Sequence, residues 1–217
     1  MTPARGGVRG GVLGGVRGGV SGMEDSGMDV RGRSPAGIVA EPVLRGPRLV
    51  LRPLTVAGIG ALRDGRCGEL ESLTGTRITA GIQPPPLLDA ALGPVRGRSL
   101  TESAAAGWWT WLAVERSTGT AVASPGLGGP PDADGCVTFG QATFAGHTGR
   151  GYAVESGCLL LDWAFREPRV RRALMTLPPH AAVALAVAAR LGFAAIGRAD
   201  DDEVGELVLL ERTCRTT

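Results

Sequence analysis

Hydrophobic and polar residues alternate in several short stretches of this chain, while other stretches carry apolar residues at helical spacing. The alternation in residues 48–52 predicts a half-buried strand that ends at Pro53. Thr55 has a side chain suited to a helix N-cap, so we expect a short helix from there through Leu62 to Arg63. The folded part of the chain therefore begins with a strand and a short helix.

The middle of the chain predicts a β-hairpin followed by a third strand. Residues 111–115 and 120–123 resemble strands and flank a Ser-Thr-Gly turn signal. A loop rich in Gly, Pro and Asp, residues 128–135, leads into a strand at 136–143. Prolines and glycines weaken every pattern over residues 74–103, where we expect loops and short helical turns.

The second half of the chain alternates helix and strand. Apolar residues at spacings of four, three and four predict one broad helix face: Val154, Cys158, Leu161 and Phe165. Pro168 ends this helix. The following segments are predicted as a strand at 170–176, an alanine-rich helix at 181–190 closed by Gly192, and strands at 194–196 and 207–210. This order predicts an α/β domain in which helices pack on a mixed sheet.

Composition defines where the folded domain begins. The 217 residues, 43% of them hydrophobic and 20% charged, suit one soluble globular domain. A four-residue unit with paired glycines repeats through residues 6–20 and offers almost no side chain to bury. We therefore expect a disordered tail over residues 1–43 and one folded domain over residues 44–217.

Charge, cysteine content and hydropathy argue against several classes of function. The net charge is only +2, and the arginines form no basic stripe, so we expect no nucleic-acid partner. The four cysteines show no C-x-x-C spacing or neighbouring histidine cluster, so we expect reduced thiols and no metal site. The chain has neither an apolar run of about 18 residues nor the apolar stretch of a signal peptide. We expect a cytoplasmic protein with no membrane partner.

One strand–turn–helix segment, residues 139–153, carries the candidate chemistry. Gly149, Arg150 and Gly151 form a turn between the predicted strand and helix. Backbone N–H groups in such a turn, together with the helix N-terminus, make a site for an anion such as a diphosphate. Because glycine has no Cβ, the phosphate can approach the backbone closely.

Several landmarks resemble the GNAT N-acetyltransferases in their order and spacing. They are residues 149–153 followed by Glu155, then residues 160–165, 170–172 and 190–193. Residues 44–54 and 129–135 are similar to the first strand and a later loop of the branch that acetylates ribosomal-protein alanine. The resemblance covers residues 44–212. It implies a single α/β (α+β) domain with a mixed, mostly antiparallel central sheet flanked by helices.

The resemblance also implies that acetyl-CoA lies between two splayed strands and that an acceptor amine attacks its thioester directly. The pyrophosphate would contact the backbone of His147, Thr148, Gly149, Arg150, Gly151, Tyr152 and Ala153. The pantetheine arm and the developing oxyanion would face the backbone of Phe139, Gly140 and Gln141. The Arg150 side chain would add a charge-assisted bond. No metal takes part.

Several positions depart from the family pattern. Thr148 replaces the usual arginine or glutamine, Thr138 replaces a strand glutamate, and Gln141 replaces a tyrosine. Ala181 and Ala184 stand where asparagine and serine are usual. Cofactor binding through the backbone tolerates these changes, whereas catalysis by side chains is reduced.

The transfer needs a neutral amine, and His180 is the candidate base, with His147 as the second imidazole. The alternative is that His180 is a helix-terminal histidine with no catalytic role. We expect an N-acetyltransferase that acts, slowly, on a primary amine of a protein N-terminus or a small molecule. The alternatives are a catalytically impaired acyl-CoA-binding protein with a regulatory or interaction role, and an interaction module with a vestigial cleft. The expected oligomeric state is a monomer or homodimer.

Overall fold

The computed structural model describes residues 42–79, 81–85, 107–202 and 205–214. The expected tail, residues 1–43, lies outside these residues except for Pro42 and Val43. Much of the segment expected to form loops, residues 74–103, also lies outside them.

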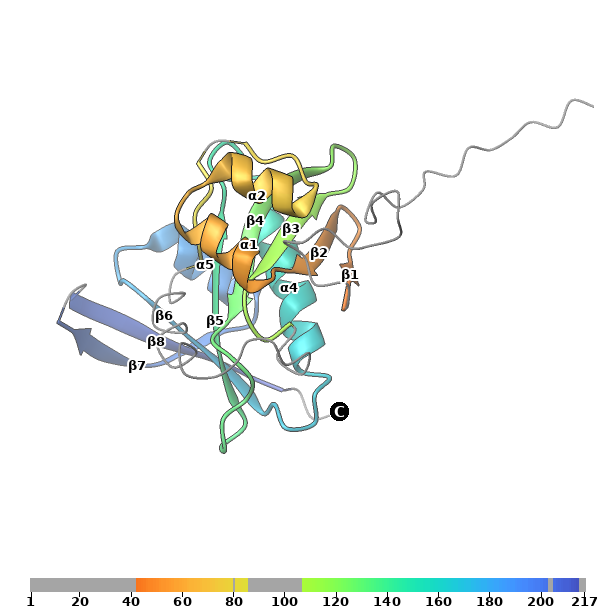
Figure 1. Ribbon diagram of the computed structural model, residues 1–217. Helices are drawn as coiled ribbons and strands as arrows, with labels where there is room; N and C mark the ends of the chain where they lie inside the picture. Colours follow the sequence, from red (N-terminus) through yellow and green to blue (C-terminus); the bar gives the residue numbers. More distant parts are fainter. Residues whose placement is uncertain (1–41, 80, 86–106, 203–204, 215–217) are drawn as a thin grey trace, which may run out of the picture.

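A single mixed sheet of eight strands runs through the described residues (Figure 1). In sheet order β1-β2-β3-β4-β5-β6-β8-β7, the strands are Leu44–Arg45, Leu49–Pro53, Trp111–Glu115, Thr120–Leu127, Cys136–Thr143, Arg172–Leu177, Gly205–Thr213 and Ala194–Asp201. Neighbouring strands are antiparallel except β5 and β6, which are parallel. The expected fold class, a mixed and mostly antiparallel sheet flanked by helices, is confirmed.

Helices cover both faces of the sheet, as Figure 1 shows for α1 and α2 on one side and α4 on the other. The described helices are α1 at Val56–Arg63, α2 at Cys67–Thr74, α4 at Tyr152–Ala164 and α5 at Ala182–Arg190. Successive residues of β3 point to opposite faces, so Leu112 packs with α1 and α2 while Ala113 packs with α4. The sheet thus separates two hydrophobic cores, and the larger one lies under α4.

The helix ends follow the capping signals in the sequence. Thr55 is the N-cap of α1, and its hydroxyl accepts a hydrogen bond from the Gly58 N–H at 3.3 Å. Gly192, directly after the C-cap of α5, has a left-handed backbone with φ of +85°. By contrast, the sequence pattern did not predict α2, because only Leu70 and Thr74 of that helix are buried.

Strands β5 and β6 pair in parallel over only three residue pairs, and the sheet is open beyond that point. The pairing joins Cys136 to Arg172, Val137 to Ala173 and Thr138 to Leu174. Beyond these residues β5 stays paired with β4 and β6 stays paired with β8, so the two strands diverge. The result is a V-shaped opening in the sheet whose apex is the short pairing.

Gly135 sets this apex. Its carbonyl accepts hydrogen bonds from the backbone N–H groups of Arg171 at 2.7 Å and Arg172 at 3.2 Å. The backbone of Gly135 is left-handed, with φ of +75°, and an added Cβ would lie 2.4 Å from the carbonyl oxygen of Arg169. Only glycine fits this position without movement of the neighbouring chain.

Candidate functional site

A cavity of about 810 Å³ occupies the opening between β5 and β6. Gln141 and Thr143 line it from the end of β5, and Met175 and Leu177 line it from the end of β6. The turn before α4 forms another part of the wall, and α5 completes it. The cavity therefore lies where the strand–turn–helix segment meets the splayed strands.

The turn before α4 offers a continuous row of backbone donors. Gly149 and Gly151 both have left-handed backbones, with φ of +75° and +78°. No acceptor in the described residues takes a hydrogen bond from the N–H groups from Thr148 to Ala153. These donors and the N-terminus of α4, a helix of 13 residues, together suit a diphosphate.

His147 does not belong to this row, which corrects the sequence-based expectation. Its backbone N–H donates to the carbonyl of Phe144 at 3.1 Å, because residues 144–147 close a tight turn after β5. The His147 side chain lines the cavity instead. Its Nε2 lies 3.4 Å from the hydroxyl of Thr79, and its buried Nδ1 has no partner among the described residues.

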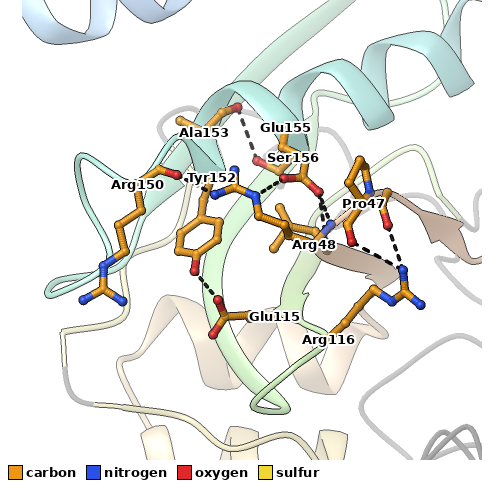
Figure 2. Close-up of polar contacts among 11 residues, drawn as sticks. Pro47, Arg48, Glu115, Arg116, Arg150, Tyr152, Ala153, Glu155 and Ser156 are labelled. Carbon is orange, nitrogen blue, oxygen red and sulfur yellow. Dashed lines mark hydrogen bonds and ion pairs between the residues drawn. The ribbon is translucent and has the colours of Figure 1, made fainter. Parts of the chain in front are cut away.

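The cavity wall includes most, but not all, of the predicted site residues. Those that line it are Gln141, His147, Thr148, Gly149, Gly151, Tyr152, Ala153 and His180. Phe139 and Gly140 are buried and do not line it, and the Phe139 ring stacks on Phe193 with centroids 5.9 Å apart. Arg150 is exposed outside the wall, and Figure 2 shows its side chain extending away from the contacts below the turn.

The part of the wall that α5 contributes is apolar except at its two ends. His180 lies exposed just before the helix, and Arg190 is its last residue. Ala181 and Ala184 both line the cavity. The asparagine and serine usual in the family at these two positions therefore have no polar counterpart here. Among the described lining residues, the titratable groups are His147, Tyr152, His180 and Arg190, and none is a carboxylate.

Tyr152 begins α4, and its hydroxyl donates a hydrogen bond to the Glu115 carboxylate. This bond lowers the pKa of Glu115, to which the hydroxyl of Thr118 also donates at 2.8 Å. The same bond raises the pKa of Tyr152, so the phenol stays protonated at neutral pH. Tyr152 is therefore held as a donor to Glu115.

Arg48 and Glu155 form a second set of contacts beneath the turn (Figure 2). The Arg48 Nε lies 2.7 Å from Glu155 Oε2, and its Nη1 donates to the carbonyl of Arg150 at 2.8 Å. Sequence patterns did not predict this role of Arg48 or the role of Glu115, because their partners lie far away along the chain. Arg48 and Glu155, for example, are 107 positions apart.

The described residues contain no group of three or more His, Cys, Asp and Glu side chains that could hold a metal ion. None of the helices in the described part is both long and apolar enough to cross a membrane.

Comparison with known proteins identifies a family that matches this chain. Residues 48–194 match the family described as an acetyltransferase (GNAT) domain. The chain is 33% identical over 66 residues to the uncharacterized N-acetyltransferase YjdG of Bacillus subtilis (strain 168). That match covers 30% of this chain, and it spans only 39% of the length of the relative.

Solved structures share the fold. The ribosomal L7/L12 α-N-protein acetyltransferase RimL superposes with a TM-score of 0.56 at 14% identity, covering 82% of this chain and 100% of that one. The ribosomal-protein-S5-alanine acetyltransferase of Vibrio fischeri superposes with a TM-score of 0.53 at 12% identity, covering 80% and 97%.

Proposed function

The chain belongs to the GNAT acetyltransferase family, and from that premise we propose that it transfers the acetyl group of acetyl-CoA to a primary amine. One observation carries the proposal: the N–H groups from Thr148 to Ala153, none of which is paired within the described residues, lie at the start of a helix and beside a cavity between splayed strands. The glycines of this row leave the approach of a diphosphate unobstructed, since an added Cβ at Gly149 would meet nothing within 4 Å.

The residues present fit acetyl-CoA as the co-substrate. Backbone N–H groups from Thr148 to Ala153 would hold the diphosphate, and the end of β5 at Gln141 would face the pantetheine arm. Gln141 has a buried Oε1 without a partner in the described residues, so a polar ligand or water nearby would satisfy it. Arg150, exposed at the turn, is in reach of solvent and would add charge only by reorienting.

In the reaction, the amine nitrogen forms a bond to the thioester carbonyl carbon, the carbon–sulfur bond breaks, and the thiolate leaves. The amine must lose a proton, which His180 or a water relay would accept. Because no carboxylate lines the described cavity, no strong fixed base is present at neutral pH. Catalysis then depends mainly on orientation of the two substrates and on backbone donors at the oxyanion.

A cavity without a lining carboxylate among the described residues favours an α-amino group as the acceptor. An α-amine has a pKa of about 7.7–8.0, whereas a lysine amine has a pKa of about 10.4. A peptide N-terminus is therefore substantially neutral near pH 7.5 without a strong base, and a lysine is not. No acidic side chain among the described residues lines the cavity to attract a polycation. We propose a protein or peptide N-terminus as the acceptor, with alanine as the first residue to test, in line with the name of the Vibrio fischeri structure.

The test compares acceptors in a thiol-release assay with acetyl-CoA. We expect turnover with a peptide that has a free N-terminal alanine. We expect little turnover with the same peptide when its N-terminus is blocked and a lysine is added. Tight acetyl-CoA binding without turnover on any amine would instead support the acyl-CoA-binding alternative.

A further inference from the structure

We propose that Arg48 is a positioning residue that holds the diphosphate-binding turn in its binding conformation. Arg48 does not line the cavity, and its side chain lies beside the turn and the start of α4 (Figure 2). This role presupposes the acetyl-CoA site proposed above.

Three contacts connect the Arg48 side chain to the start of α4 (Figure 2). Its Nη1 donates to the Arg150 carbonyl at 2.8 Å, and its Nε donates to the Glu155 carboxylate at 2.7 Å. Its guanidinium carbon lies 4.9 Å from the centroid of the Tyr152 ring, at cation–π distance. One side chain thus contacts the turn, the first residue of the helix and its first-turn carboxylate.

The contact with the Arg150 carbonyl decides the direction of the next N–H group. A trans peptide unit is planar, so the carbonyl of Arg150 and the N–H of Gly151 point in opposite directions. Arg48 holds the carbonyl on its own side of the turn, and the Gly151 N–H is thereby directed away from Arg48. Gly151 lines the cavity, and its left-handed backbone could otherwise rotate with little steric cost.

Glu155 fixes Arg48 in this position. Its Oε1 accepts the backbone N–H groups of Arg48 at 2.8 Å and of Leu49 at 3.0 Å, so α4 is joined to the start of β2. The Glu155 side chain is only 12% exposed, and its charge is balanced by Arg48. Arg48 therefore acts through the backbone of the turn and not as a direct ligand of phosphate.

Arg116 provides a matched control. It is also an exposed arginine at this end of the sheet, and its Nη1 lies 3.2 Å from the Gly46 carbonyl and 3.4 Å from that of Pro47. It holds the turn between β1 and β2 and makes no contact with residues 150–155 among the described interactions.

The experiment measures the dissociation constants of acetyl-CoA and of acetyl-pantetheine, which lacks the diphosphate, for the wild type, Arg48→Gln and Arg116→Gln. We expect Arg48→Gln to weaken acetyl-CoA binding about tenfold, the effect of losing a charge-assisted hydrogen bond. Acetyl-pantetheine binding should stay unchanged in this variant. Arg116→Gln should bind both compounds as the wild type does.

Equal acetyl-CoA affinity in the wild type and Arg48→Gln would overturn the proposal, and so would equal weakening of both compounds. If the wild type binds no acetyl-CoA, the proposed function itself fails. If circular dichroism shows that Arg48→Gln is unfolded, Arg48→Lys replaces it, because lysine keeps a cation beside Glu155 but cannot also reach the Arg150 carbonyl. The same selective loss of acetyl-CoA affinity is expected there, and its absence would overturn the proposal.

Discussion

The phenolic hydroxyl of Tyr152 donates to the carboxylate of Glu115, and this bond joins the first residue of α4 to the last residue of β3. Glu115 ends the strand just before the β3–β4 turn, and the hydroxyl of Thr118 in that turn donates to the same carboxylate. The helix N-terminus that faces the cavity is therefore anchored to a hairpin on its other side.

Replacing Tyr152 with phenylalanine should remove this anchor and keep the ring under Arg48. We expect a loss of about 1 kcal/mol in the free energy of unfolding at pH 7, the usual contribution of one hydrogen bond. For a domain of this size the melting temperature should fall by about 2–4 °C. Thermal denaturation followed by circular dichroism measures the difference.

The difference between wild type and Tyr152→Phe should depend on pH. The pKa of Glu115 is lowered by the Tyr152 bond, so its contribution is present above the ordinary carboxyl pKa of about 4.3 and is lost as pH falls through the lowered value. The pKa of Tyr152 is raised by the same bond, so its contribution is present below about pH 10 and is lost as pH rises through the raised value. A stability difference that stays constant from pH 3 to pH 11 would contradict this account.

Gly151→Glu should abolish the stabilisation by acetyl-CoA. In the wild type, acetyl-CoA at about 100 times its dissociation constant should stabilise the fold by about 2.7 kcal/mol. The variant places a carboxylate beside the diphosphate donors, and its Cβ would lie 3.4 Å from Arg48 Nη2. A thermal-shift titration measures the effect.

Gly146→Glu is the control for Gly151→Glu. Gly146 is also left-handed, with φ of +80°, and an added Cβ there would meet nothing within 4 Å. The backbone strain is thus similar in the two variants, and only the position differs. Gly146→Glu should keep the acetyl-CoA shift; a full shift in Gly151→Glu would mean that the diphosphate binds elsewhere.

Gly135→Ala should destabilise the protein strongly by disturbing the apex of the opening. Both Gly135 and Gly119 are left-handed, but an added Cβ at Gly119 meets nothing within 4 Å, whereas at Gly135 it meets the Arg169 carbonyl oxygen at 2.4 Å. We expect a loss of about 1 kcal/mol for Gly119→Ala from backbone strain and at least about 3 kcal/mol for Gly135→Ala. Urea denaturation measures the free energy of unfolding of both variants. Equal losses would show that the backbone around Gly135 and Arg169 moves to accommodate the added Cβ.

His180→Ala should lower the rate of acetyl transfer at pH 7 by up to about 100-fold, if the imidazole accepts the proton of the amine. The dissociation constant of acetyl-CoA should not change, because His180 is not part of the turn that carries the diphosphate donors. Equal rates in both proteins would remove His180 from the mechanism and leave a water relay.

Removal of residues 1–41 should leave the melting temperature unchanged within about 2 °C, because their glycine-rich composition offers little apolar surface to bury. Calorimetry of the truncated and full-length proteins tests this expectation. A truncated chain that no longer folds would show that the tail contributes to the core.

The strands and helices with strong local patterns were predictable from the sequence, and β5 is the clearest case, since its observed bounds, Cys136–Thr143, are those expected. Patterns fail where tertiary contacts decide the outcome. Strand β4 continues through Pro125 and Gly126 to Leu127, because its residues 123–127 pair with residues 139–143 of β5. Strand β7 likewise extends beyond the predicted residues 194–196 to Asp201, because β8 pairs with residues 197–201.

The candidate site also combines features that local sequence patterns predict with features that only tertiary contacts set. The glycines of the turn and the helix behind them are local features, so the sequence predicted the glycine-bearing turn at a helix start that forms the candidate anion site. The anchors of that turn are not local, since Arg48, Glu115 and the helix start come together only in the folded sheet. The position of His147 was also decided by a contact without a sequence signal, the hydrogen bond from its N–H to Phe144.

The short pairing of β5 with β6 has a consequence for the order of folding. The pairs β3–β4, β4–β5 and β7–β8 join strands that follow one another along the chain, whereas β5 and β6 meet only after α4 has crossed between them. Non-local parallel pairing is slow because the intervening chain must first be ordered. The β3–β4–β5 and β7–β8 pairs can therefore form early, and β5 and β6 join late, at three residue pairs. An intermediate that has formed these hairpins but not the β5–β6 junction would lack the cavity.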